Sequence, residues 1–204
     1  MVLVMKTTTA WAHPHSWIDT TTTIEGDGQS ITGFHMAWTF DPMTTAYMLD
    51  GEDMSASQRE QTLHKVALSV INNMLSSHYF TYFFEPDGKT PIRYQQVDTA
   101  TLTMDKGKAT LRFDLPLVKP YPFNGNSLTL KIFDPTYYVD MSWDDKHPLQ
   151  LSDTLRSHCQ AQIIEPNPTP KQVSYAMSIP ADADPDDALG QLFTQTAKIT
   201  CEPS

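Results

Sequence analysis

The chain has little of what several functional classes require. Only 14 of its 204 residues are Lys or Arg, against 24 Asp or Glu, so the formal net charge is -10. Nucleic-acid binding relies on clustered basic residues, and this balance argues against it. No apolar run approaches the roughly 20 residues that a membrane helix needs, so we expect no membrane insertion of the mature chain. The two cysteines lack CxxC spacing, which argues against a redox enzyme or a cysteine metal centre.

Motifs of common enzyme classes are also missing. The sequence contains no GxSxG, HExxH, P-loop or Rossmann glycine pattern. We therefore expect a protein that is not an enzyme. The length suffices for one domain with a sizeable core, and we assign that domain to residues 13–204.

The first twelve residues are interpreted as the remnant of a signal peptide. Ala10-Trp11-Ala12 is a small-x-small triplet of the kind that signal peptidase cuts after. The apolar run before it is short and is followed by Lys6, whereas a complete leader places its positive charge first. We expect export to the periplasm, with His13 as the first residue of the mature protein.

Alternating polar and apolar residues predict a largely β structure. Residues 16–25 and 30–40 read as two strands of a hairpin, because Gly26-Asp27-Gly28 lies between them. In the second strand, four large residues share the predicted inner face: Phe34, Met36, Trp38 and Phe40. Further strands are predicted at residues 79–84, 92–104, 108–116, 127–133, 139–143, 159–165 and 198–201.

Helix signals are confined to a few segments. Asp41-Pro42 is a good helix start and predicts a short helix over residues 43–49. Ser57 and Glu60 resemble a capping box and predict a long helix from there to about residue 77. Residues 166–170 read as a stiff loop and 188–196 as a short helix. The expected fold is an α+β, antiparallel β-sandwich-like domain with one long inserted helix and a short C-terminal helix.

Cys159 and Cys201 are far apart in the sequence. In an oxidising compartment they would form a disulfide, and the closed loop would stabilise the fold by about 4 kcal/mol in the chain-entropy model. The alternative is a pair of buried free thiols.

The tripeptide His13-Pro14-His15 points to metal binding. Residues i and i+2 of an extended segment project to the same side, so one ion can meet both imidazoles. Pro14 has no N–H and excludes a copper site that uses the amides of a free N-terminus. Zn²⁺ usually takes four ligands, so further ligands are needed. The candidates for them are His35, Asp19, Asp41 and Asp134; the alternative is a structural segment that caps the sheet edge.

The segment Asp134-Pro135-Thr136-Tyr137-Tyr138 is the second candidate site. Asp before Pro favours a turn in which the carboxylate accepts hydrogen bonds from nearby backbone. Tyr137 and Tyr138 either line a substrate-binding pocket with their phenol groups or fill the core at a structural bend. His147 and His158 lie in or beside loops and receive no ligand assignment.

Taken together, several segments resemble the domain-of-unknown-function 1007 family of exported bacterial proteins. They are Ala12-His13-Pro14-His15 with Trp17-Ile18-Asp19, Trp38-Thr39-Phe40-Asp41, Tyr79-Phe80-Thr81, Phe133-Asp134-Pro135-Thr136-Tyr137-Tyr138-Val139, and the cysteines. The resemblance implies a periplasmic protein, often labelled a substrate-binding component of an ABC-type transporter. It also implies an association with nickel/cobalt permeases.

We therefore expect a periplasmic metal-binding accessory or solute-binding protein of a divalent transition-metal transport system. Zn, Ni and Co all suit imidazole ligands, and no organic cofactor is expected. The expected partner is a membrane metal permease or ABC transporter. The alternative is a non-catalytic β-sandwich module that binds a membrane permease and in which the His13-Pro14-His15 segment is structural.

Overall fold

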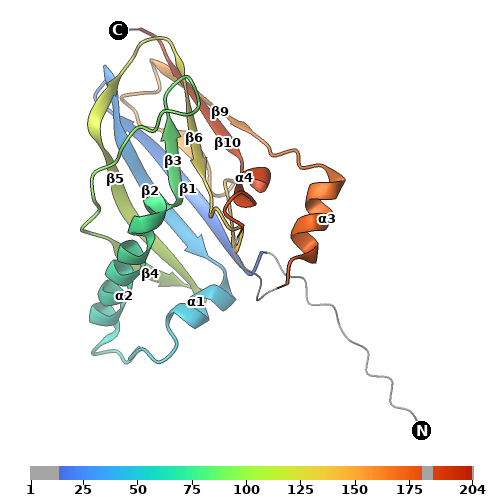
Figure 1. Ribbon diagram of the computed structural model, residues 1–204. Coiled ribbons are helices and arrows are strands. Elements are labelled where there is room, and N and C mark those ends of the chain that lie inside the picture. The colour runs from blue at the N-terminus through green and yellow to red at the C-terminus, as the bar shows by residue number, and fades with distance from the viewer. Residues whose placement is uncertain (1–13, 181–185, 204) are drawn as a thin grey trace.

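The computed structural model describes residues 14–180 and 186–203 as two β-sheets that face each other (Figure 1). The larger sheet has the order β4-β5-β2-β1-β7, with β8 also paired to β1, and the smaller has the order β3-β6-β10-β9. This confirms the α+β sandwich-like fold. The predicted signal remnant and His13 lie outside the described residues.

The strands are β1 (Ser16–Gly26), β2 (Ser30–Phe40), β3 (Thr81–Phe84), β4 (Thr101–Asp105), β5 (Lys108–Pro122), β6 (Ser127–Ile132), β7 (Val139–Ser142), β8 (Leu149–Leu151), β9 (Cys159–Ile164) and β10 (Thr196–Cys201). The helices are α1 (Pro42–Met48), α2 (Arg59–Met74), α3 (Pro170–Ser178) and α4 (Gly190–Phe193), with a 3₁₀ segment η1 (Leu75–Phe80) after α2. The helices α1 and α2 lie at one end of the sandwich, whereas α3 and α4 lie along the side of β9 and β10 (Figure 1).

The β1–β2 hairpin confirms the predicted alternation. Ile18 pairs with Phe40 and Thr22 with Met36, and these side chains are buried between the sheets. The odd-numbered residues of β1 consequently face outward, because successive side chains of a strand point to opposite faces. Asp19 is therefore on the outer face of the larger sheet.

The strands that pair with β1 at the edge of the larger sheet are parallel to it, whereas the sequence predicted an antiparallel fold. Both β7 and β8 run parallel to β1, with Asp19 opposite Ser142 and Thr22 opposite Leu149. β7 follows β6 of the other sheet and therefore crosses to the larger sheet rather than returning by a hairpin. The three-residue β8 was not predicted because it is too short to show alternation.

Two helix starts differ from prediction. Helix α2 begins at Arg59 after Gln58, which makes no side-chain capping bond, so the predicted capping box at Ser57 is wrong. The N–H groups of Gln58 and Arg59 both donate to the Ser55 carbonyl, and this preceding turn delays the helix. Helix α3 was missed: Thr169 and Gln172 form the capping box there, with proline at the first helical position.

A left-handed turn precedes β3, where the sequence predicted the first residues of the strand. His78, Tyr79 and Phe80 have φ of 52°, 53° and 50°. Such a conformation costs a residue other than glycine roughly 1–2 kcal/mol. Buried contacts hold it in place, since the Tyr79 ring is in the core and its hydroxyl accepts a hydrogen bond from the Val97 N–H at 2.9 Å.

Replacing Tyr79 by Phe is expected to lower the free energy of unfolding by about 1–3 kcal/mol, because it leaves the buried Val97 N–H without an acceptor. Urea denaturation measures the change. The same substitution at Tyr47, which is 85% exposed, serves as the control and is expected to be neutral. Equal stability of the two variants would show that the Tyr79 hydroxyl does not hold the turn.

The predicted disulfide is present. Cys159 and Cys201 occupy paired positions of β9 and β10 and are bonded to each other. Disulfides of this kind persist in oxidising compartments. None of the helices within the described residues combines the length and the apolar composition of a membrane span.

Candidate functional site

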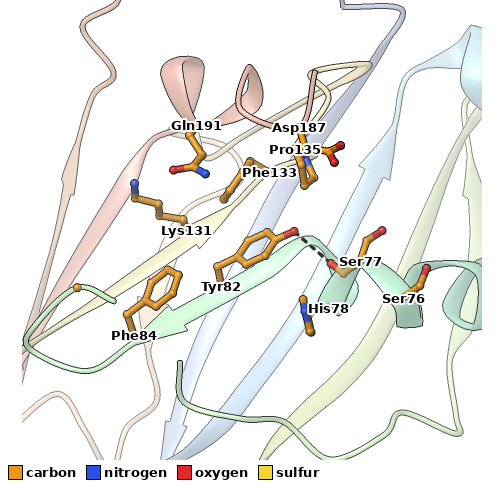
Figure 2. Close-up of a pocket in the computed structure, with 11 residues that line it drawn as sticks. Ser76, Ser77, His78, Tyr82, Phe84, Lys131, Phe133, Pro135, Asp187 and Gln191 are labelled. Atoms are coloured by element: carbon orange, nitrogen blue, oxygen red, sulfur yellow. Dashed lines mark hydrogen bonds between the residues drawn. The ribbon is translucent and has the colours of Figure 1, made fainter. Parts of the chain in front are cut away.

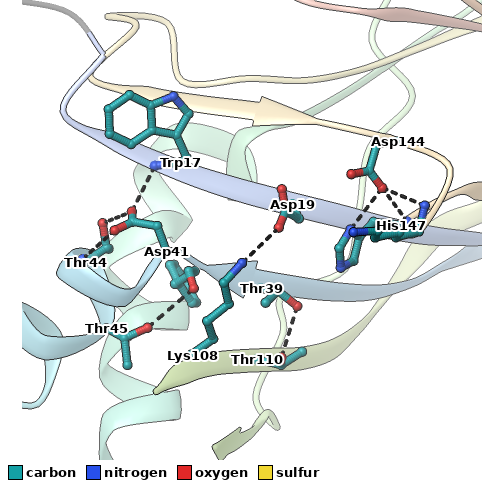
Figure 3. Close-up of polar contacts among 12 residues, drawn as sticks. Trp17, Asp19, Thr39, Asp41, Thr44, Thr45, Lys108, Thr110, Asp144 and His147 are labelled. Atoms are coloured by element: carbon teal, nitrogen blue, oxygen red, sulfur yellow. Dashed lines mark hydrogen bonds and ion pairs between the residues drawn. The ribbon is translucent and has the colours of Figure 1, made fainter. Parts of the chain in front are cut away.

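Three potential metal ligands gather at the β1–β7 edge of the larger sheet (Figure 3). Asp19 projects outward from β1, and Asp144 and His147 lie in the loop between β7 and β8. One ligand atom of each residue lies within 4.8 Å of a ligand atom of the others. In a tetrahedral Zn²⁺ site with bonds of about 2.1 Å, ligand atoms are about 3.4 Å apart. Small side-chain rotations are therefore enough to close the group around one ion.

The parallel pairing of β7 with β1 brings these residues together. Ser142 lies opposite Asp19, so the chain that leaves β7 carries Asp144 past the Asp19 side chain. The loop then closes between Asp144 and His147, whose backbone groups exchange two hydrogen bonds of 3.1 and 3.2 Å. β8 follows at once and returns the chain to β1.

Hydrogen bonds preorganise Asp144. Its Oδ1 accepts from the N–H groups of Lys146 at 2.8 Å and His147 at 2.7 Å, and it lies 3.0 Å from the His147 Nδ1. Partial burial would raise the pKa of Asp144, but these hydrogen bonds outweigh it and lower the pKa below its ordinary value. The carboxylate is thus ionised near neutral pH, and within the described part of the chain its Oδ2 has no hydrogen-bond partner.

Asp19 forms an ion pair with a lysine of the same chain. The Lys108 ammonium lies 3.6 Å from Asp19 Oδ2, and its side chain is 44% exposed (Figure 3). A flexible, half-exposed lysine can swing away when an ion binds to Asp19. The side chains of Asp19 and His147 are 33% and 24% exposed, so an ion held there would keep open positions for water or for a partner's ligand.

Asp41, a predicted ligand, serves as the cap of α1. Its carboxylate accepts from the N–H groups of Met43, Thr44 and Trp17 and from the Thr44 hydroxyl (Figure 3). Burial acts to raise the pKa of Asp41, but the Thr44 hydroxyl and the three backbone donors lower it overall. Both oxygens are engaged by neighbouring groups of the fold.

Asp134, also a predicted ligand, holds the turn that the sequence predicted. Only 6% of it is exposed, and its carboxylate accepts from the Thr136 N–H and hydroxyl and from the Val139 N–H. This arrangement starts β7 beside β1. Its oxygens point into the turn, not toward the Asp19 cluster.

The structure separates His15 from His35, the two predicted histidine ligands that lie within the described residues. His35 lies opposite Thr23 of β1, and its Nδ1 is 2.6 Å from Asp114 Oδ1 on β5. Thr23 is eight residues beyond His15, or about 26 Å along the strand, so His15 and His35 do not meet at one ion. His15 lies instead on the Asp134 turn: its N–H donates to the Tyr138 carbonyl at 2.9 Å, and the two rings stack with centroids 5.3 Å apart.

The two predicted pocket tyrosines pack against other rings. Tyr138 stacks on His15, and Tyr137 stacks on Phe193 of α4 with centroids 4.4 Å apart. Burial, and then the nearby Asp140 carboxylate, raise the pKa of Tyr137 to about 12. A hollow lies on the outer face of β3 and β6, and Phe133 and Pro135 of the same segment line it. Neither Tyr137 nor Tyr138 is among its lining residues.

Asp144 and His147 were not assigned as ligands from the sequence. The available signal is the segment Asp144-Asp145-Lys146-His147, in which a turn brings residues i and i+3 together. This segment indicates a metal site only when Asp19 is beside it. Asp19 is 125 residues earlier in the sequence and becomes a neighbour through the parallel pairing of β1 with β7.

Comparison with known proteins agrees with the resemblance seen in the sequence. The family model described as "Protein of unknown function (DUF1007)" matches residues 1–201. An uncharacterized protein of Haemophilus influenzae is 33% identical over 193 residues, which cover 94% of this chain and 92% of the relative. The match thus extends over both sheets and the Asp19 cluster.

Proposed function

The chain belongs to the DUF1007 family, and from that premise we propose that it is a periplasmic metal-binding accessory protein of a divalent transition-metal transport system. The observation that carries the proposal is the convergence of Asp19, Asp144 and His147. One imidazole and two carboxylates suit Zn²⁺, Ni²⁺ and Co²⁺ and do not discriminate among them. The disulfide fits the periplasm, which is an oxidising compartment.

The incomplete ligand set supports a role in metal delivery. Structural zinc sites are closed by four protein ligands, whereas three ligands leave a position for exchange. The cluster of Asp19, Asp144 and His147 is also partly exposed. A metal-coordinating side chain of the transporter can therefore reach an ion held there. His15 lies four residues before Asp19 on the chain, about 13 Å along the strand. His13 and His15 would therefore bind an ion at a second place on the protein, and this second site stays a prediction.

Calorimetric titration with Zn²⁺, Ni²⁺ and Co²⁺ tests the proposal. We expect wild-type protein to bind one of these ions with micromolar or tighter affinity. The variant D144N/H147A removes two ligands and should weaken binding at least tenfold. The matched control is D50N/H64A, since Asp50 and His64 are exposed and lie on or beside other elements. It should bind as the wild type does.

Two results would contradict this assignment in different ways. Failure of the wild type to bind any of the three ions would refute metal binding as the function. Binding that survives D144N/H147A but is lost in H13A/H15A would move the site to the N-terminal histidines. Circular dichroism of each variant confirms that the fold is retained.

An exposed apolar patch favours a second candidate, the interaction module. Trp17, Met43 and Tyr47 are 47%, 65% and 85% exposed. Trp17 and Met43 both donate N–H groups to Asp41, and Tyr47 is one helical turn beyond Met43. Large apolar side chains gathered in this way suit a protein partner, here a membrane permease. The variant W17S/Y47S should abolish co-purification with such a permease from native membranes and leave metal affinity unchanged.

A further inference from the structure

A hollow of about 450 Å³ lies on the outer face of the smaller sheet, on the side of the sandwich away from Asp19. Its floor comes from β3 and β6, and η1 and the segment leading into α4 form its rims (Figure 2). This volume is within the range of small-molecule sites. The lining residues are Ser76, Ser77, His78, Tyr82, Phe84, Gly88, Lys131, Phe133, Pro135, Asp187 and Gln191.

Strand alternation explains why the floor combines a cation with an aromatic ring. On β3 and β6, Phe83 and Leu130 are buried between the sheets. Their neighbours Tyr82 and Lys131 therefore face outward, and these two occupy directly paired positions. A bound molecule thus meets a ring and an ammonium side by side.

Lys131 makes no ion pair with any carboxylate of the described residues. The side chain is half-buried, and burial and then the neighbouring Lys198 lower its pKa. An ammonium in that position, in a chain of net charge -10, is best stabilised by an anion that enters the hollow. The Asp187 carboxylate lies on the opposite side, beyond the Tyr82 ring (Figure 2), and also has no ion-pair partner among the described residues.

The aromatic part of the hollow suits a flat apolar group. The rings of Tyr82 and Phe133 have centroids 4.5 Å apart and an interplanar angle of 35°. The Tyr82 hydroxyl donates to the Ser77 carbonyl at 3.4 Å and is directed away from Lys131 (Figure 2). The Tyr82 ring lines the hollow, so a flat group that enters can stack on it, which adds to the burial of apolar area.

We propose that this hollow binds a small aromatic acid that carries an amino or hydroxyl group at the end of its ring away from the carboxylate. The ligand carboxylate pairs with the Lys131 ammonium, its ring stacks on Tyr82, and its amino or hydroxyl group donates to Asp187 on the opposite side. This site is independent of the metal site, which lies on the other sheet, and does not rest on the proposed metal function.

Titration calorimetry in the presence of EDTA tests the proposal with four related probes. Para-aminophenylacetate and para-hydroxyphenylacetate carry both the carboxylate and the donor, phenylacetate lacks the donor, and para-ethylphenol lacks the carboxylate. We expect the first two to bind, phenylacetate to bind more weakly, and para-ethylphenol not to bind. K131M should weaken para-hydroxyphenylacetate binding roughly 10- to 100-fold, the range for losing a charge-assisted hydrogen bond.

K119M is the matched control, because Lys119 is an exposed lysine on β5 and should leave binding unchanged. D187N should weaken the binding of para-hydroxyphenylacetate but not of phenylacetate, which gives a second test should K131M fail to fold. The proposal is overturned if neither para-substituted acid binds the wild type, if K131M binds as K119M does, or if D187N weakens para-hydroxyphenylacetate and phenylacetate equally.

Discussion

Replacing Cys159 and Cys201 together by alanine is expected to lower the free energy of unfolding by about 4 kcal/mol. The cysteines are 42 residues apart in the sequence. In the chain-entropy model, closing a loop of that length lowers the entropy of the unfolded chain and stabilises the folded state by about 4 kcal/mol. The disulfide joins β9 to β10 at paired positions. For a chain of this size, the change corresponds to a melting temperature lower by about 8–16 °C.

Thermal and urea denaturation measure this effect, with wild-type protein under reducing conditions as the parallel sample. The alanine variant and the reduced wild type should converge on similar stability, because both lack the cross-link. A C159A/C201A protein within about 1 kcal/mol of the oxidised wild type would show that the bond contributes little.

Replacing Gly190 by Ala is expected to cost about 3 kcal/mol and to displace α4. A Cβ at this position would lie 1.9 Å from the Asp134 carbonyl oxygen, which is backbone and cannot rotate away. Moving α4 outward breaks the Gly190 N–H bond to the Pro135 carbonyl at 2.7 Å and separates Tyr137 from Phe193. The estimate of about 3 kcal/mol combines overpacking with the loss of one hydrogen bond and one aromatic pair.

Gly51→Ala is the control for this substitution. Gly51 has φ of 75° and no heavy atom within 4 Å of an added Cβ, so its cost is that of left-handed backbone alone, about 1–2 kcal/mol. Chemical denaturation compares the two variants. Because Gln191 lines the hollow, G190A should also weaken the binding of para-hydroxyphenylacetate, whereas G51A should not. Similar stability of the two variants would contradict the close backbone contact at Gly190.

Local patterns in the sequence predicted the features that depend on neighbouring residues. The alternation around Met36 and Trp38 gave the hairpin and its buried face, and Asp41 before Pro42 gave the start of α1. Asp134 formed the expected turn. In each of these cases the partner groups are a few residues away in sequence or belong to one hairpin.

Features that depend on distant pairing were not predictable in the same way. Two of the left-handed residues, Tyr79 and Phe80, carry strong β-forming side chains. Their conformation is held by contacts with distant residues, among them the hydrogen bond from the Val97 N–H to the Tyr79 hydroxyl. The Asp19 cluster likewise depends on β7 running parallel to β1. Sequence reasoning named Asp19 as a carboxylate near the metal, but the pairing that adds Asp144 and His147 has no local signature.

Crystals grown or soaked with Zn²⁺ or Ni²⁺ test the central claim most directly, through anomalous diffraction at the absorption edge of the metal. We predict a peak about 2.0–2.2 Å from a ring nitrogen of His147 and from carboxylate oxygens of Asp19 and Asp144. Lys108 should have moved away from Asp19. Anomalous peaks that lie only at other residues, or none at saturating metal, would contradict the account.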